Sequence, residues 1–257
     1  MALRLPRIIP RLAIKGENVV CTVNCEGLRV VGKPEELARK YAEDADEIFY
    51  LDTVASLYGR NQLTELLSRT CEDVFIPITV GGGVKSRADV KRLLDAGADK
   101  VAINTAAVRA PRLIRECADY YGSQAIVLNI EARRTEGGWE ALTDAGRERT
   151  GKDAQAWAAQ AVALGAGEIL LTSVDQEGTR RGFDAQLLEA IAQEVRVPVT
   201  ICGGMGSLEH LEAVAGVADG VAMASVLHYG ALTVQDMREA LGQADRMRRQ
   251  PRAWGQA

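Results

Sequence analysis

Short apolar runs rich in β-branched residues alternate along the chain with longer stretches in which apolar residues recur at helical spacing. The apolar runs predict strands at Arg7–Ile14, Glu47–Asp52, Phe75–Val80, Lys100–Asn104, Ala125–Glu131, Glu168–Ser173, Val197–Cys202 and Gly220–Ala224. The stretches between them predict helices, among them Pro34–Tyr41, Arg87–Ala96, Pro111–Tyr121, Asp153–Leu164 and Ala185–Val195. Strands that are apolar throughout and separated by helices are typical of a parallel sheet covered by helices.

Eight such units in a chain of 257 residues match a (β/α)8 barrel in number and size. An open, doubly wound sheet is the alternative, and its first strand–helix turn should carry the pattern G-x-G-x-x-G. The segment after the first predicted strand reads Lys15-Gly16-Glu17-Asn18 instead. The sequence therefore favours an α/β fold, a (β/α)8 or TIM barrel, that forms a single domain over residues 1–257.

An internal repeat divides the chain into two halves. The segment Phe75–Gly83 (FIPITVGGG) aligns with Arg196–Gly204 (RVPVTICGG), and the same spacing relates Glu47 to Glu168. A chance likeness between strand–helix units does not explain one constant spacing over separate segments. We therefore predict a barrel built from two half-barrel repeats of four strand–helix units each.

Composition places the chain among ordinary globular proteins, with 47% hydrophobic and 26% charged residues and a formal net charge of −4. This balance gives no electrostatic footprint for nucleic acid or an anionic membrane, and no run of 18 apolar residues predicts a membrane span. The amino-terminal residues lack the apolar core of a secretory signal, and five cysteines at unrelated spacings favour free thiols in a reducing cytoplasm. Only two histidines leave little material for a zinc site, and the sequence indicates no metal and no organic cofactor.

Two glycine-rich turns follow predicted strands, Gly81-Gly82-Gly83 in the first half and Gly203-Gly204 in the second. In a barrel, the groups that bind ligands lie at the carboxyl ends of the strands. Glycine there lets backbone N–H groups approach an anion without obstruction by Cβ. The ends of the following strands, Asn104-Thr105 and Ala224-Ser225, would complete two phosphate sites. Glycines after strands are also common as plain turns, but their duplication favours a ligand with a phosphate at each end.

Longer motifs resemble one family. Phe75–Ala107 (FIPITVGGGVKSRADVKRLLDAGADKVAINTAA), Gly165–Asp184 (GAGEILLTSVDQEGTRRGFD) and Ala224–Gly230 (ASVLHYG) are similar to the cyclase subunit of imidazole glycerol phosphate synthase, HisF. The sister isomerase family of histidine biosynthesis shares the glycine turns, but the run Leu171–Asp175 is closer to the cyclase.

The resemblance implies a barrel in which a HisH-like glutaminase docks on the amino-terminal face as a heterodimer partner and releases ammonia. The ammonia would pass through the barrel and react with a bisphosphate at the opposite face. Family phosphate positions fall on Gly82, Gly83, Asn104, Thr105, Glu177, Gly178, Gly203, Gly204, Ala224 and Ser225, and Glu177 stands where the family has an aspartate.

The resemblance also places four charged residues at the amino-terminal mouth as an ammonia gate: Arg7, Glu47, Lys100 and Glu168. Two positive and two negative charges in a closed ring would satisfy one another, whereas an unpaired buried charge is costly. The alternative is a solvated rim of charges at strand starts, which is common in barrels. Asp99, beside Lys100, matches the family's contact to the glutaminase.

The two aspartates that carry the family's acid–base chemistry are both replaced. Ala13, in Arg11-Leu12-Ala13, occupies the first position, and Glu131, in Ile130-Glu131-Ala132, occupies the second. Ala13 cannot give or accept a proton, and loss of one acid–base group typically costs ~10²–10⁴ in rate. The family's first-loop lysine falls at Cys21.

These departures favour a HisF-like synthase subunit with altered chemistry, in which Glu131, Asp52 or Asp175 transfers protons while ammonia is used on a phosphorylated, sugar-derived substrate. The ordinary cyclase of histidine biosynthesis is one alternative. A noncatalytic barrel that docks a glutaminase in surface-sugar amidation is another. A phosphosugar isomerase like the sister family is a third, and Ala13 counts against it too.

Overall fold

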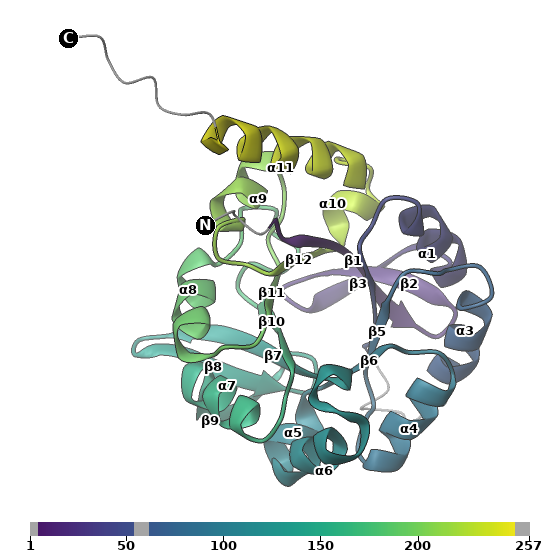
Figure 1. Cartoon of the computed structure of the whole chain (residues 1–257), viewed down its shortest axis with the longest axis vertical. Coiled ribbons are helices and arrows are strands. Elements are labelled where there is room, and N and C mark those ends of the chain that lie inside the picture. The colour runs from purple at the N-terminus through teal and green to yellow at the C-terminus, as the bar shows by residue number, and fades with distance from the viewer. Residues whose placement is uncertain (1–4, 54–61, 250–257) are drawn as a thin grey trace.

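A computed structural model describes residues 5–53 and 62–249 of the chain. Figure 1 shows strands around a central axis, with helices on the outside of the ring. Eight of the described strands are parallel to one another: β1 (Arg7–Lys15), β4 (Ile48–Asp52), β5 (Ile78–Gly81), β6 (Lys100–Ile103), β7 (Ile126–Thr135), β10 (Glu168–Ser173), β11 (Val199–Cys202) and β12 (Gly220–Met223).

These eight strands close into a barrel. Neighbours pair in the order β1, β4, β5, β6, β7, β10, β11 and β12, and β12 pairs with β1 again, with Gly220 opposite Arg7. The predicted (β/α)8 barrel is therefore confirmed. Because all eight strands are parallel, their carboxyl ends share one rim of the barrel and their amino ends share the other.

Helices connect consecutive strands of the barrel and cover its outer face. Their bounds are α1 (Pro34–Ala42), α3 (Gln62–Thr70), α4 (Arg87–Asp95), α5 (Thr105–Arg109), α6 (Arg112–Tyr121), the 3-10 turn η1 (Ser123–Ala125), α7 (Ala154–Ala163), α8 (Ala185–Glu194), α9 (Leu208–Val214), α10 (Ser225–His228) and α11 (Val234–Arg249). No described helix is both long enough and apolar enough to cross a membrane.

The strands bury both of their faces, which explains their unbroken apolar runs. Residues such as Ile8, Tyr50 and Ile169 belong to the large core between sheet and helices. Their alternating neighbours form a second cluster inside the barrel, made of Ile9, Phe49, Leu51, Ala102, Val127, Leu170, Cys202 and Ala222. This apolar layer separates the amino-terminal rim of the barrel from the carboxyl-terminal rim.

Two hairpins extend the barrel, and the sequence did not predict them. β2 (Asn18–Val23) and β3 (Glu26–Gly32) follow the first barrel strand, and β8 (Gly138–Thr143) and β9 (Glu148–Asp153) follow the fifth. One hairpin in each half, directly after its first strand, agrees with the half-barrel repeat. β3 and β9 are mostly exposed, so they carry no apolar run that would mark them as strands.

Two predicted strands begin later than expected, for a common reason. The prediction started them at Phe75 and Val197, but β5 begins at Ile78 and β11 at Val199. Proline has no N–H to donate to a strand ladder. Pro77 and Pro198 therefore only accept, from Ile48 N and Ile169 N at 2.9 Å each, and regular pairing begins after them. Phe75 is 88% exposed.

Candidate functional site

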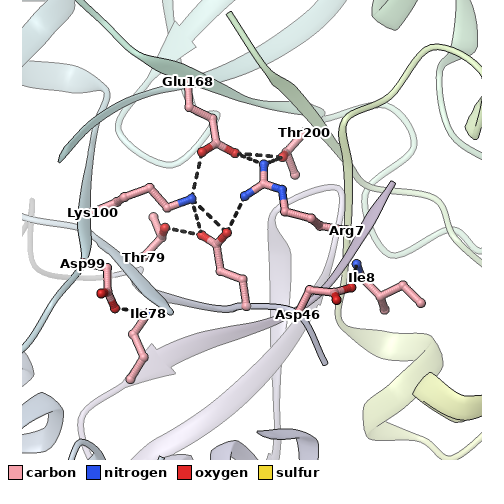
Figure 2. A network of polar contacts seen from close by, with 10 residues as sticks. Arg7, Ile8, Asp46, Ile78, Thr79, Asp99, Lys100, Glu168 and Thr200 are labelled. Atoms are coloured by element: carbon pink, nitrogen blue, oxygen red, sulfur yellow. Dashed lines mark hydrogen bonds and ion pairs between the residues drawn. The ribbon is translucent and has the colours of Figure 1, made fainter. Parts of the chain in front are cut away.

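The four charged residues predicted at the amino-terminal mouth form a closed ring of ion pairs. Arg7 contacts both Glu47 (Nη1–Oε2, 2.5 Å) and Glu168. Lys100 contacts the same two carboxylates, each at 2.8 Å from its Nζ. Figure 2 shows Arg7, Lys100 and Glu168 pointing toward one another across the barrel axis.

Two threonines complete the ring from neighbouring strands. Thr79 Oγ1 donates to Glu47, and Thr200 Oγ1 donates to Glu168 at 3.1 Å (Figure 2). The side chains of Glu47 and Glu168 are only 4% and 11% exposed. A solvated rim of charges, the alternative considered for these positions, is therefore wrong. The ring closes the axis with groups that pair with one another.

The charges of the ring set the ionisation of Glu168. Burial by itself would raise the pKa of this carboxyl, but Lys100 and Arg7 outweigh burial and hold its pKa below the ordinary value. Glu168 therefore contributes stability above the pKa of an unfolded glutamate. That contribution is lost as the pH falls through the lowered pKa of the folded state.

Removing one cation tests how tightly the ring is coupled. We expect Lys100→Met to lower the free energy of unfolding by about 3 kcal/mol, because it leaves two buried carboxylates with one cation between them. Lys91→Met is the matched control, since Lys91 forms an exposed pair with Asp95 whose loss should hardly change the stability. Urea unfolding measures both variants, and equal stabilities would contradict a coupled ring.

Asp99, the predicted partner contact, is exposed beside the ring. Its carboxylate accepts from the backbone N–H of Ile78 at 2.8 Å, where β5 begins, and Asp46 makes the same contact to Ile8 N at 2.8 Å (Figure 2). Asp99 therefore fixes the start of a strand and still presents its side chain on the amino-terminal face.

At the opposite rim, the first glycine turn lines a cavity of about 310 Å³. Four of the residues predicted to bind phosphate line it, and so do two of the predicted catalytic carboxylates. They are Gly82, Gly83, Asn104, Thr105, Asp52 and Glu131. The strand-end residues of the first half thus meet in one place, as predicted.

The second glycine turn lines a smaller cavity of about 20 Å³ on the same rim. All six phosphate positions predicted in the second half line it: Glu177, Gly178, Gly203, Gly204, Ala224 and Ser225. Ala13, at the first of the two aspartate positions, also faces this cavity. We refer to the two cavities as the first and second pockets.

Glycine is required in both turns by the conformation of the backbone. Gly82 has φ +108° and Gly204 has φ +105°, in the region that L side chains rarely adopt. A Cβ on Gly82 would lie 2.4 Å from the carbonyl oxygen of Asp52, and one on Gly204 would lie 1.9 Å from that of Gly182. The turns therefore press against neighbouring backbone, which fixes the walls of the pockets.

Glu131 is a buried carboxyl on β7 that reaches the first pocket. It accepts hydrogen bonds from Asn104 Nδ2 at 3.0 Å and from the backbone N–H of Gly146. Burial raises its pKa, although Arg11 and these donors act in the opposite direction. A carboxyl with a raised pKa, held in a ligand-sized pocket, is a candidate for proton transfer.

Comparison with known proteins now decides the family. Residues 7–233 match the family model described as "Histidine biosynthesis protein". An imidazole glycerol phosphate synthase subunit HisF of Legionella pneumophila is 58% identical over 205 residues, covering 79% of this chain and 97% of that protein. The HisF subunit of a Nocardioides species is 50% identical over 93% of this chain and 96% of its own length, and that of Thermobifida fusca is 51% identical over 91% and 95%.

The chain belongs to the HisF family.

The remaining predicted carboxylate of this HisF family member, Asp175, lies apart from both pockets. It lines a separate cleft with Arg134 and Asp184, and its carboxylate accepts from Arg134 N at 2.8 Å. Glu131 and Asp52 are thus the two predicted catalytic carboxylates that the first pocket brings together.

Cys21, which stands in place of the family's loop lysine, lies on β2 and lines the second pocket. Burial raises the pKa of its thiol to about 11. The thiol is therefore protonated near neutral pH, and Cys21 is a poor nucleophile.

Sequence reasoning missed one residue of the site, Arg11. Its guanidinium lies inside the barrel, lines the second pocket and is 6% exposed. Alternation along β1 was the available signal, because Arg7, Ile9, Arg11 and Ala13 share one face of the strand and Arg7 points inward. Arg11, two residues before the aspartate position that Ala13 occupies, is therefore expected to face the interior.

Proposed function

We propose that this chain is the cyclase subunit of an imidazole glycerol phosphate synthase, a lyase-type enzyme of histidine biosynthesis. It would receive ammonia from a HisH-like glutaminase at the charged ring and use it on a sugar-derived bisphosphate at the opposite rim. The observation that carries the proposal is the placement of two glycine-walled pockets on one rim and a closed ring of ion pairs on the other. The sequence by itself favoured altered chemistry, but relatives 50–58% identical over most of the chain are HisF subunits and support the ordinary reading better.

The two pockets support a ligand with an anion at each end. Each is walled by a glycine turn with left-handed backbone, a geometry that admits a phosphate close to the main chain. The two aspartate positions of the family are divided between them, with Glu131 in the first pocket and Ala13 in the second. A bisphosphate that spans both pockets would place its middle beside Glu131.

Glu131 is the residue best placed for proton transfer. Ammonia must lose a proton when it bonds to carbon, and the later ring closure needs protons moved between nitrogen and oxygen. The carboxylate of Glu131 is buried and fixed by two donors, so it would receive such a proton without a large rearrangement. Asp52 lines the same pocket and is the second candidate for this work.

Entry of ammonia at the amino-terminal rim is supported by the ring. Ion pairs that satisfy one another seal the axis against water, and small movements of the Lys100 or Arg7 side chain would open it. The apolar layer behind the ring would favour passage of neutral ammonia over ammonium. Asp99 lies exposed beside the ring, where a docked glutaminase would reach it.

A second candidate function rests on Ala13 and Arg11. The second pocket has a methyl group at the aspartate position and a buried cation next to it. In that case the chain would still bind a glutaminase and receive its ammonia, but would use it on a different phosphorylated acceptor. Alternatively, it would dock the glutaminase without catalysis in surface-sugar amidation.

Turnover with ammonium salt separates these candidates. The purified chain is mixed with the bisphosphate substrate of the HisF reaction and ammonium chloride at alkaline pH, and formation of imidazole glycerol phosphate is followed. We expect product. If the chain binds the bisphosphate without forming product, the altered-acceptor or noncatalytic candidate replaces our proposal.

The raised pKa of Glu131 predicts the acid side of the pH profile. Glu131 accepts protons only when ionised, so activity should fall as the pH drops through its raised pKa, above the ~4.3 of an ordinary glutamate. A pH–rate profile with ammonia held constant measures this, with circular dichroism to confirm that the chain stays folded. A folded chain whose activity persists down to pH 4.5 would contradict the role of Glu131.

A further inference from the structure

Arg11 carries a buried charge that the HisF-type chemistry does not use. It lies on β1, four residues after Arg7 and on the same inward face. Its backbone carbonyl accepts from His228 Nε2 at 3.0 Å, and His228 Nδ1 in turn bonds the hydroxyl of Tyr41 at 2.8 Å. The strand is therefore fixed where the side chain enters the barrel.

The guanidinium of Arg11 has few partners within the part of the chain that the structure describes. Nη1 approaches Cys202 Sγ at 3.6 Å, and Nε has no hydrogen-bond acceptor. No carboxylate of the described residues lies within 4.0 Å of it, the distance of an ion pair. A buried cation without a direct counterion is costly, so this arrangement indicates a partner that the described residues do not supply.

The nearest carboxylates are held by other donors. Glu177 accepts from Thr22 Oγ1 and from Cys25 N, each at 2.9 Å. Glu131 accepts from Asn104 and faces the first pocket. Both therefore contribute negative potential near Arg11 while their oxygens are fixed elsewhere. Neither carboxylate forms an ion pair with Arg11, which itself lines the second pocket.

The Gly203–Gly204 turn, Gly178 and Ser225 also line the second pocket. Among the described residues, the first pocket has no matching buried cation: Lys85 is exposed, and Arg109 is 70% exposed by its side chain and paired with Asp144 at 2.9 Å. The two pockets thus differ in their described lining, because the second includes the buried Arg11.

We propose that Arg11 is an anion-binding residue of the second pocket, where its guanidinium donates to an oxygen of a phosphate group seated against the Gly203–Gly204 turn. The guanidinium fork matches phosphate oxygens in geometry and charge, and such charge-assisted bonds are strong when buried. The proposal rests on the proposed function for the identity of the anion. It makes the second pocket the tighter of the two phosphate sites and fixes which end of an unsymmetrical bisphosphate enters it.

Titration calorimetry with inorganic phosphate tests the proposal without requiring catalysis. The full chain, Arg11→Met, Arg11→Lys and the control Arg112→Met are compared at constant ionic strength. Arg112 is an exposed arginine on α6 whose side chain is 87% exposed. We expect the tighter phosphate site to weaken by about tenfold or more in Arg11→Met and by less in Arg11→Lys, and to be unchanged in Arg112→Met.

The outcomes separate this proposal from the proposed function. Arg11→Met that binds phosphate as tightly as the unchanged chain overturns the role of Arg11, even if the chain turns over the bisphosphate. Weaker binding in Arg11→Met supports it, even if the chain makes no imidazole glycerol phosphate. If Arg11→Met does not fold, Arg11→Lys decides, because it keeps the charge and loses the fork, and binding equal to that of the unchanged chain then overturns the proposal.

Discussion

We expect Glu131→Gln to lower ammonium-dependent turnover by about 10²–10⁴-fold while bisphosphate binding changes little. The amide keeps the shape of the side chain and can still meet Asn104, which donates to Glu131 at 3.0 Å. It cannot accept the proton that ammonia releases. Because Ala13 leaves the other family position without an acid–base group, no second aspartate shares the work at that position.

The control for this variant is Glu136→Gln, an exposed glutamate that follows the end of β7. It should turn over at the rate of the unchanged chain. Rates measured at saturating bisphosphate separate chemistry from binding. If Glu131→Gln keeps more than about a tenth of the activity, Asp52 becomes the leading candidate for proton transfer, and the assignment of Glu131 is wrong.

We expect Gly204→Ala to raise the dissociation constant for the bisphosphate by at least about tenfold. The left-handed backbone at this position costs an L-residue about 1–2 kcal/mol, and one factor of ten in affinity corresponds to about 1.4 kcal/mol. The added Cβ would also lie 1.9 Å from the carbonyl oxygen of Gly182, so the turn that walls the second pocket must move. Gly82→Ala should act in the same way on the first pocket, where the contact is to Asp52.

Gly216→Ala is the matched control, because a Cβ there meets nothing within 4 Å and the backbone is not left-handed. It should bind the bisphosphate normally. Calorimetry on the three variants, with thermal unfolding to confirm the fold, gives the comparison. Normal affinity in Gly204→Ala would mean that the second turn does not hold the ligand.

The barrel itself was predictable because two independent signals mark its strands, the apolar runs and the internal repeat. Burial on both faces forces unbroken apolar residues in strands such as β4, and the repeat doubles each signal. The first hairpin was not predicted, because β3 is exposed along most of its length and carries no apolar run. Its turn, at Asn24 and Cys25, has two residues with positive φ but lacks the glycine that usually marks such a turn.

The walls of the candidate site were also predictable, because the carboxyl ends of all strands in a closed parallel barrel lie on one rim. Asn104 and Ser225 follow barrel strands and therefore line the predicted pockets. The role of Arg11 was not predictable from motif matching, because Arg11 is not among the positions that the resemblance assigns to phosphate binding or catalysis. Only the side-chain contacts within the barrel show that this guanidinium forms no ion pair with the residues that the structure describes.

The two changes on β1 belong together. The second pocket lacks the carboxylate that the family has at the position of Ala13, and Arg11 gives the same pocket a cation. Glu131 and the ring of ion pairs keep charges that the proposed ammonia chemistry would use. Under the proposed function, the chain would keep an ammonia route and a base while Arg11 adds a cation to the second pocket.

Transfer of labelled nitrogen tests most directly whether ammonia that enters at the amino-terminal rim is used at the carboxyl-terminal rim. The chain, its cognate glutaminase and the bisphosphate are given glutamine labelled with 15N at the amide, in a solution that contains excess unlabelled ammonium. If ammonia enters through the ring and travels inside the barrel, the imidazole product carries mainly 15N. A product with the isotopic composition of the ammonium in solution would show that nitrogen arrives from outside, and would contradict the account.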